Sequence, residues 1–164
     1  MAAINDTSFI IIGGRLRDNS LIGGNLAQIY NLETGIWTRM QDMEPGRYMP
    51  KCLNFMDGVM VAGGDIPTWK TLEFPGIVSK DVNFFNLTTN MWQKLPSMNY
   101  ARNNHILAQV NGIPTVIGVF NLGQGGVFNN NAEQFINGRW SNWIEQPPAI
   151  WHSFVQVPKD DFHC

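Results

Sequence analysis

The chain has 164 residues, of which 44% are hydrophobic and 15% charged, a composition typical of one globular domain. Its net charge of −2 provides no broad field to attract nucleic acid or anionic lipid. No apolar run approaches the roughly 18 residues of a membrane span, and residues 1–7 lack the basic and apolar regions of a signal peptide. We therefore expect neither a nucleic-acid nor a membrane partner.

Two other residue types leave the cellular compartment open. Cys52 and Cys164 are too few and too far apart for a disulfide framework, so we expect two free thiols. Asn5 and Asn86 each begin an Asn-x-Thr triplet, which permits glycosylation if the protein is secreted.

The first of three similar units opens with a short β-branched run that ends in two glycines, Gly13 and Gly14. A polar loop over residues 15–25 follows the glycines. The unit extends over residues 2–40, and its four strands are expected at residues 2–4, 8–12, 26–30 and 36–40.

The second unit, residues 47–95, repeats this order. Asp57-Gly58 is a hairpin signal between its first two strands, Gly63 and Gly64 end the second strand, and a long loop over 65–80 follows. Its strands are expected at residues 51–55, 59–62, 82–85 and 91–95.

The third unit, residues 102–145, departs slightly from the other two. Asn111-Gly112 is again a hairpin turn, but Gly118 is followed by Val119 in place of a second glycine. Its strands are expected at 105–110, 113–117, 132–136 and within 140–145, with a loop over 119–131.

Fixed spacings connect the three units. An aromatic residue precedes a tryptophan by seven or eight positions in the pairs Tyr30 and Trp37, Phe85 and Trp92, Phe135 and Trp143. An arginine precedes a glycine by sixteen positions in the pairs Arg47 and Gly63, Arg102 and Gly118. Such periodicity indicates a repeat architecture. Four-stranded sheets must stack to bury both faces, and the aromatic residues would fill the space between them.

A glycine pair, an aromatic residue, a tryptophan and an arginine in this order resemble the kelch repeat over nearly the whole chain. The resemblance to the kelch and galactose-oxidase-like families implies an all-β fold, a β-propeller with one four-stranded antiparallel blade per repeat. It also implies a protein-interaction module that binds a protein partner, since only a few such domains are enzymes. We expect no catalysis and no cofactor.

Three units do not close a propeller, which needs about four to eight blades. Residues 151–164 read as a terminal stub, with one strand at 151–157 and the start of another. We therefore expect an incomplete propeller. Either further blades of a longer chain or a second copy in a homo-oligomer would complete it.

The long loops and the connections between units share one face, which we call the loop face, and binding usually occurs on such loops. Arginine suits carboxylate recognition and tryptophan suits an interaction hot spot. The candidate partner-binding residues on this face are Arg15, Arg17, Arg47, Trp69, Lys70 and Arg102. Arg47 and Arg102 occupy the same place in successive repeats, which also indicates a structural role in which each donates hydrogen bonds to main-chain carbonyls between blades.

Two alternatives remain. His105 and His152 fall at equivalent places near the axis, but a metal would need further ligands, so we expect no metal site. A galactose-oxidase-like carbohydrate-active or carbohydrate-binding propeller is one alternative function. A structural component that assembles through its open blade faces is another.

Overall fold

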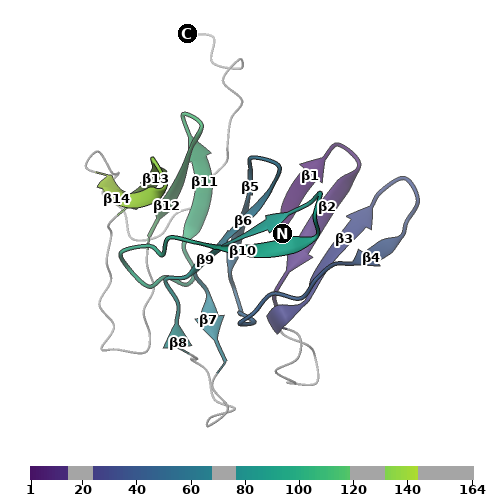
Figure 1. Cartoon of the computed structure of the whole chain (residues 1–164), viewed down its shortest axis with the longest axis horizontal. Coiled ribbons are helices and arrows are strands. Elements are labelled where there is room, and N and C mark those ends of the chain that lie inside the picture. The colour runs from purple at the N-terminus through teal and green to yellow at the C-terminus, as the bar shows by residue number, and fades with distance from the viewer. Residues whose placement is uncertain (15–23, 68–76, 119–131, 144–164) are drawn as a thin grey trace.

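The computed structural model describes residues 1–14, 24–67, 77–118 and 132–143, in which the regular elements are β-strands apart from a 3₁₀ turn at Gly24 and Asn25. The strands form three four-stranded antiparallel sheets and one two-stranded ladder. The predicted fold class, an all-β array of blade-like sheets, is confirmed, and the three described sheets form an open array (Figure 1). No helix of the described part is long and apolar enough to cross a membrane.

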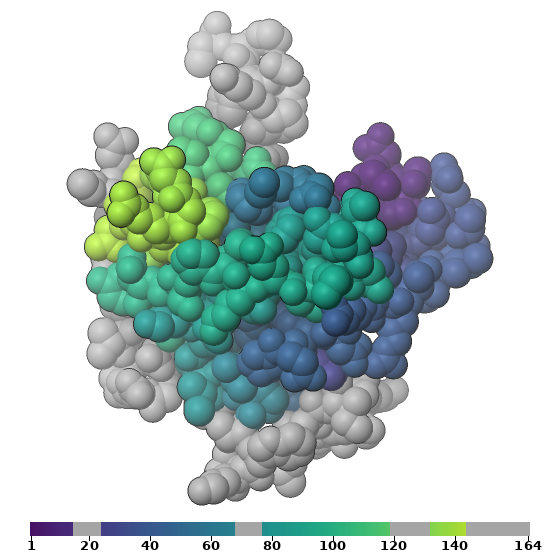
Figure 2. Space-filling model, viewed as in Figure 1, coloured from purple at the N-terminus to yellow at the C-terminus, as the bar shows by residue number. Residues whose placement is uncertain are grey.

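Each large sheet falls within one predicted unit, and we call the sheets blades 1, 2 and 3. Blade 1 contains β1 (Ala2–Asn5), β2 (Ser8–Ile12), β3 (Ala27–Asn31) and β4 (Trp37–Arg39). Blade 2 contains β5 (Lys51–Phe55), β6 (Gly58–Ala62), β9 (Val82–Asn86) and β10 (Met91–Leu95). Blade 3 contains β11 (Ile106–Val110), β12 (Ile113–Ile117), β13 (Ala132–Ile136) and β14 (Arg139–Trp143). The blades stand side by side with blade 2 in the middle (Figure 2).

The core lies in two layers between the blades. We call the side of a blade that packs on the following blade its forward face, and the side that packs on the preceding blade its rear face. One layer joins the forward face of blade 1 to the rear face of blade 2: Ile10, Ile12 and Ala27 meet Val59, Val61 and Phe85. The other joins blade 2 to blade 3: Met60, Ala62 and Val82 meet Leu107, Val116 and Trp140. Burial of these apolar side chains is the main force that stacks the sheets.

The linker to the next blade passes over the end of the second strand at the glycine pair. We call this place a blade crossing: the first is at Gly13 and Arg47, the second at Gly63 and Arg102. A Cβ on Gly13 would lie 2.5 Å from the carbonyl oxygen of Arg47, and one on Gly63 would lie 2.4 Å from that of Arg102. Gly64 N–H also donates to the Arg102 carbonyl at 2.7 Å. Only glycine allows so close an approach and the positive φ found here.

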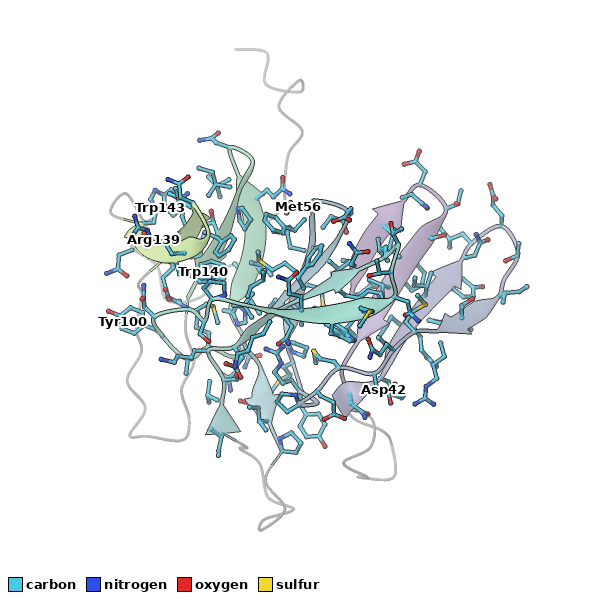
Figure 3. All side chains as sticks on the ribbon, in the orientation of Figure 1. Asp42, Met56, Tyr100, Arg139, Trp140 and Trp143 are labelled. Atoms are coloured by element: carbon cyan, nitrogen blue, oxygen red, sulfur yellow. The ribbon has the colours of Figure 1, made fainter. Side chains whose placement is uncertain are left out.

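The third tryptophan of the repeat is Trp140, which takes the place predicted for Trp143. Trp37 pairs across its strands with Tyr30, and Trp92 pairs with Phe85. In blade 3, a two-residue turn of Asn137 and Gly138, both with positive φ, joins β13 to β14. Because this turn is shorter than in the other blades, Trp140 lies opposite Phe135, and Trp143 lies opposite Ala132 (Figure 3 labels both tryptophans).

The segment predicted as a loop over 65–80 contains two further strands. β7 (Asp65–Ile66) and β8 (Ile77–Val78) pair antiparallel as a short hairpin. In Figure 1, this hairpin lies on the lower side of the blades, whereas the tight turns within the hairpins of blades 1 to 3 lie on the upper side. The hairpin therefore belongs to the loop face.

Candidate interaction face

The base of the β7–β8 hairpin is fixed to both connections between blades. We call residues 40–50 linker 1 and residues 96–105 linker 2. Asp65 and Tyr48 of linker 1 exchange two main-chain hydrogen bonds of 2.8 Å. The side-chain amide of Asn103, in linker 2, donates to Asp65 Oδ1 at 2.8 Å. The Asp65 side chain is buried, which raises its pKa, while the bond from Asn103 opposes this.

The hairpin also presents apolar surface. Ile77 in β8 is 63% exposed, and Met49 in linker 1 is 38% exposed. The chain between β7 and β8 contains Trp69 and Lys70, two of the predicted binding residues. Both lie outside the described residues, as do Arg15 and Arg17. These four candidates therefore stay predictions.

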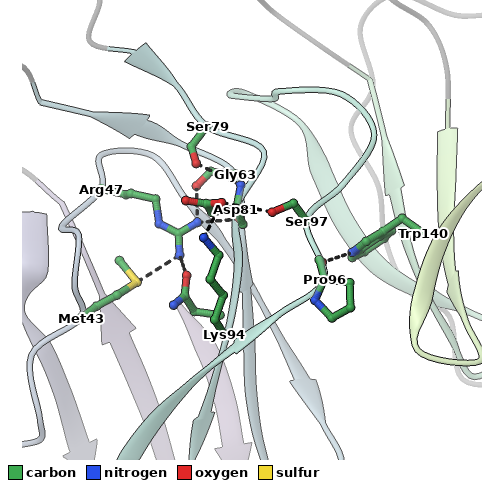
Figure 4. Close-up of polar contacts among 10 residues, drawn as sticks. Met43, Arg47, Gly63, Ser79, Asp81, Lys94, Pro96, Ser97 and Trp140 are labelled. Atoms are coloured by element: carbon green, nitrogen blue, oxygen red, sulfur yellow. Dashed lines mark hydrogen bonds and ion pairs between the residues drawn. The ribbon is translucent and has the colours of Figure 1, made fainter.

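Arg47 is completely buried and joins blade 1 to blade 2. Its main-chain N–H donates to the carbonyl of Gly24, just before β3 of blade 1, at 2.7 Å. Its Nη1 donates to the carbonyl oxygens of Gly63 at 3.1 Å and Asp81 at 2.7 Å, and its Nη2 donates to Asn83 Oδ1. Figure 4 shows the guanidinium among these acceptors. Burial lowers the pKa of Arg47 to about 10, against the opposing effect of the Asp81 charge.

Arg102 has the equivalent position one blade later and is also completely buried. Its main-chain N–H donates to Ser79 of blade 2 at 3.0 Å, and its Nη1 donates to the carbonyl of Gly118 at 2.6 Å. Its Nη2 and Nε donate to Glu133 Oε1 at 2.8 and 3.2 Å, and neither side chain has exposed surface. Burial lowers the pKa of Arg102, while Glu133 acts in the opposite direction.

Arg47 and Arg102 are therefore removed from the candidate interface. Neither has exposed surface with which to contact a partner. The spacing of sixteen is explained by the glycine whose carbonyl each arginine bonds. The sequence did not predict the acceptors Asn83 and Glu133. Each is a polar residue at the second position of the third strand of its blade, next to an apolar residue, and this repeated position could have indicated them. Gln28 holds this position in blade 1.

His105 packs against a glycine of blade 2. It is 1% exposed, and a Cβ on Gly63 would lie 2.6 Å from its ring. Burial and, next, the charge of Arg102 lower its pKa to about 3. Pro50 makes the equivalent contact with Gly13. The described residues hold no group of three or more His, Cys, Asp or Glu that could bind a metal, and His152 lies outside them.

A cavity of about 450 Å³ opens along the first strands of the three blades. Its lining consists of Ala2, Ala3, Cys52, Leu53, Asn54, Leu107 and Gln109. The Gln109 amide donates to the carbonyl of Asn54 at 2.9 Å, which ties β11 to β5. Burial raises the pKa of the free Cys52 thiol, which disfavours the reactive thiolate. The cavity therefore offers no activated nucleophile among its described residues.

Both sequons lie in side-chain-stabilised turns. Asn5 Oδ1 accepts from the N–H of Thr7 at 3.0 Å. Asn86 Oδ1 accepts from the N–H groups of Thr88 and Thr89 at 2.9 and 2.8 Å, and its Nδ2 donates to Asp57 at 2.6 Å. These asparagines shape their turns, a use that requires no glycan.

Comparison with known proteins gives a likeness of fold. No protein-family model and no curated protein matches the chain. Among solved structures, that of YjhT matches with a TM-score of 0.69 and 18% sequence identity, over 89% of this chain and 50% of YjhT. The chain thus spans about half the length of YjhT. At this identity, the likeness shows that the two share a fold of blade-like β-sheets.

Proposed function

We propose that the chain is a kelch-type protein-interaction module that binds a protein partner through its loop face, without catalysis. The β7–β8 hairpin is the observation that carries this proposal. Its base is held by the buried Asp65, which contacts both linkers. Binding usually occurs on loops held by a rigid scaffold, and the base of this hairpin is fixed in that way.

The residues of the face support the same role. Ile77 exposes an apolar side chain at the residue that follows, in sequence, the segment containing Trp69 and Lys70. Tryptophan is enriched in interaction hot spots, and a flanking charge favours association with a complementary partner. In this role the chain needs no cofactor.

The test is a capture experiment with the full chain and a Trp69→Ala, Lys70→Ala double variant. We expect the double variant to lose the proteins that the wild-type chain retains, because the centre of the contact is removed. Met56→Ala is the matched control, since Met56 is 83% exposed in the β5–β6 turn on the opposite side (Figure 3). If the double variant captures every partner as well as Met56→Ala does, the loop-face assignment is wrong.

A further inference from the structure

The rear face of blade 1 has the chemistry of a blade contact but no described blade against it. Phe9, Ile11, Tyr30 and Trp37 are its apolar residues, and they correspond in register to Val59, Val61, Phe85 and Trp92 of blade 2. In blade 2, the first three of these are completely buried against blade 1. In blade 1, Ile11 is 38% exposed and Trp37 is 47% exposed.

The aromatic residues of this face already have the arrangement found inside the core. The rings of Tyr30 and Trp37 lie 4.7 Å apart at 42°, and those of Phe85 and Trp92 lie 4.9 Å apart at 46°. Phe9 packs on both rings of blade 1, at 5.4 and 5.9 Å. The face is thus preorganised for contact, which lowers the entropic cost of docking.

Polar groups on the same face lack the partners that their equivalents have. Trp92 Nε1 donates to the carbonyl of Gln41 in linker 1 at 2.8 Å, and Trp140 Nε1 donates to that of Pro96 in linker 2 at 3.0 Å. Each of these tryptophans therefore bonds the linker that precedes its blade. Trp37 Nε1 has no acceptor within the described part of the chain.

The residues that accept from the linker arginines show the same difference between blade 1 and the other two blades. Asn83 and Glu133 each accept from the arginine of the preceding linker. Gln28 is the equivalent residue of blade 1. Its cross-strand neighbour Arg39 pairs with Asp42, and among the described residues no arginine donates a hydrogen bond to Gln28. The open face therefore offers one donor and one acceptor at the two places where a linker would bind.

We infer that the rear face of blade 1 docks a further blade of the same repeat, distinct from blades 1 to 3. The occupant has an aliphatic forward face, like Ile10, Ile12 and Ala27. Its linker supplies a main-chain carbonyl to Trp37 and an arginine to Gln28. This contact continues the two blade interfaces that the chain already contains, and it does not rest on the proposed role of the loop face.

A second copy of this chain does not supply such a blade. Its remaining forward face is that of blade 3, which carries Thr115, Ile117 and Gln134. This face is more polar than that of blade 1, because Gln134 donates to the Thr115 hydroxyl at 3.2 Å where blade 1 has Ile29 and Ile10. A surface with these polar groups does not match the aromatic rear face of blade 1, because their burial there would be costly.

The test adds a blade of known sequence in front of the full chain. Residues 1–50 are fused directly before Met1, because Gly13 and Gly63 show an offset of fifty residues between units. The added copy carries Trp37→Phe, so that the Trp37 indole of the original blade is the one observed by NMR. We expect the solvent exchange of its N–H to slow by about tenfold or more relative to the unfused chain. The Trp92 indole, already bonded to Gln41, serves as the internal control.

Two variants make the result specific. Arg47→Ala in the added copy alone removes the arginine meant for Gln28, and we expect it to reverse part of the protection. If the Trp37 indole exchanges as fast in the fusion as in the unfused chain, whether or not the added blade folds, the inference is wrong. Sedimentation of the unfused chain is expected to show a monomer. A dimer that Trp37→Asp dissociates would identify a second copy as the occupant and overturn the inference.

Discussion

The two blade crossings place equivalent arginines against acceptors of different charge. Arg47 donates to two carbonyl oxygens and to the neutral amide of Asn83. Arg102 donates to the carbonyl of Gly118 and forms an ion pair with Glu133, in which both side chains are completely buried. The Glu133 carboxylate also accepts from the main-chain N–H groups of Asn99 and Tyr100 at 2.7 and 3.3 Å.

Both positions share a buried arginine that bonds the carbonyl of the glycine sixteen residues later, whereas a direct counter-charge is found only at Arg102 among the described residues. Carbonyl dipoles hold the Arg47 guanidinium without a direct carboxylate contact, although its pKa is lowered to about 10. A buried ion pair adds little net stability over a neutral arrangement, but removal of one partner is strongly destabilising. The second crossing should therefore be the more fragile one.

The largest expected effect is that of Glu133→Ala. This change leaves Arg102 buried without its counter-charge and two main-chain N–H groups without an acceptor. We expect the free energy of unfolding, measured by urea denaturation, to fall by about 3–5 kcal/mol. Glu33→Ala, at an exposed turn, is the matched control and should change it by less than about 0.5 kcal/mol. A loss below about 1 kcal/mol would show that Arg102 can rely on carbonyls as Arg47 does.

The second crossing should also respond to acid, because His105 lies there and Pro50 holds its place at the first crossing. The pKa of His105 is about 3 in the folded chain, against an ordinary value of 6.5. Between these values the unfolded chain binds the proton more tightly, so the free energy of unfolding falls as the pH falls below 6.5. The contribution is about 1.4 kcal/mol for each pH unit.

His105→Gln tests this contribution by removing the titrating ring. We expect its loss of stability between pH 6 and pH 4 to be smaller than that of the wild-type chain by roughly 2 kcal/mol, from denaturation at several pH values. The carboxylates titrate in both proteins, so the difference isolates His105. Parallel pH profiles would contradict the burial of a neutral ring at this crossing.

The smallest expected effect comes from Asn83→Asp, which makes the first crossing resemble the second. The new carboxylate would attract Arg47, but its own desolvation offsets most of this gain. We expect the free energy of unfolding at pH 7 to change by less than about 1 kcal/mol. Asn54→Asp, at an exposed position of β5, controls for the added charge. A gain of more than about 2 kcal/mol would mean that the neutral site leaves Arg47 poorly compensated.

The strands were predictable because their sequence signals are local. Lys51–Phe55, Met91–Leu95 and Ile113–Ile117 have the predicted bounds, since β-branched runs end there at turn residues. The prediction that Trp143 lies opposite Phe135 was wrong. It relied on a nearly constant spacing between the aromatic residue and the tryptophan, but the Asn137-Gly138 turn is shorter than the turns of the other blades and places Trp140 there. The β7–β8 hairpin escaped prediction because two-residue strands carry no periodicity.

The sequence by itself determined the repeating unit: four short strands, a glycine pair, an aromatic residue and an arginine, all specified by turn chemistry and spacing. The tertiary structure decided what these markers do. It buried Arg47 and Arg102 between blades, paired one with an amide and the other with a carboxylate, and left Trp37 exposed while it buried Trp140. The physical reason is that burial depends on the neighbouring blade, so equivalent positions of the repeat differ in exposure wherever that neighbour differs.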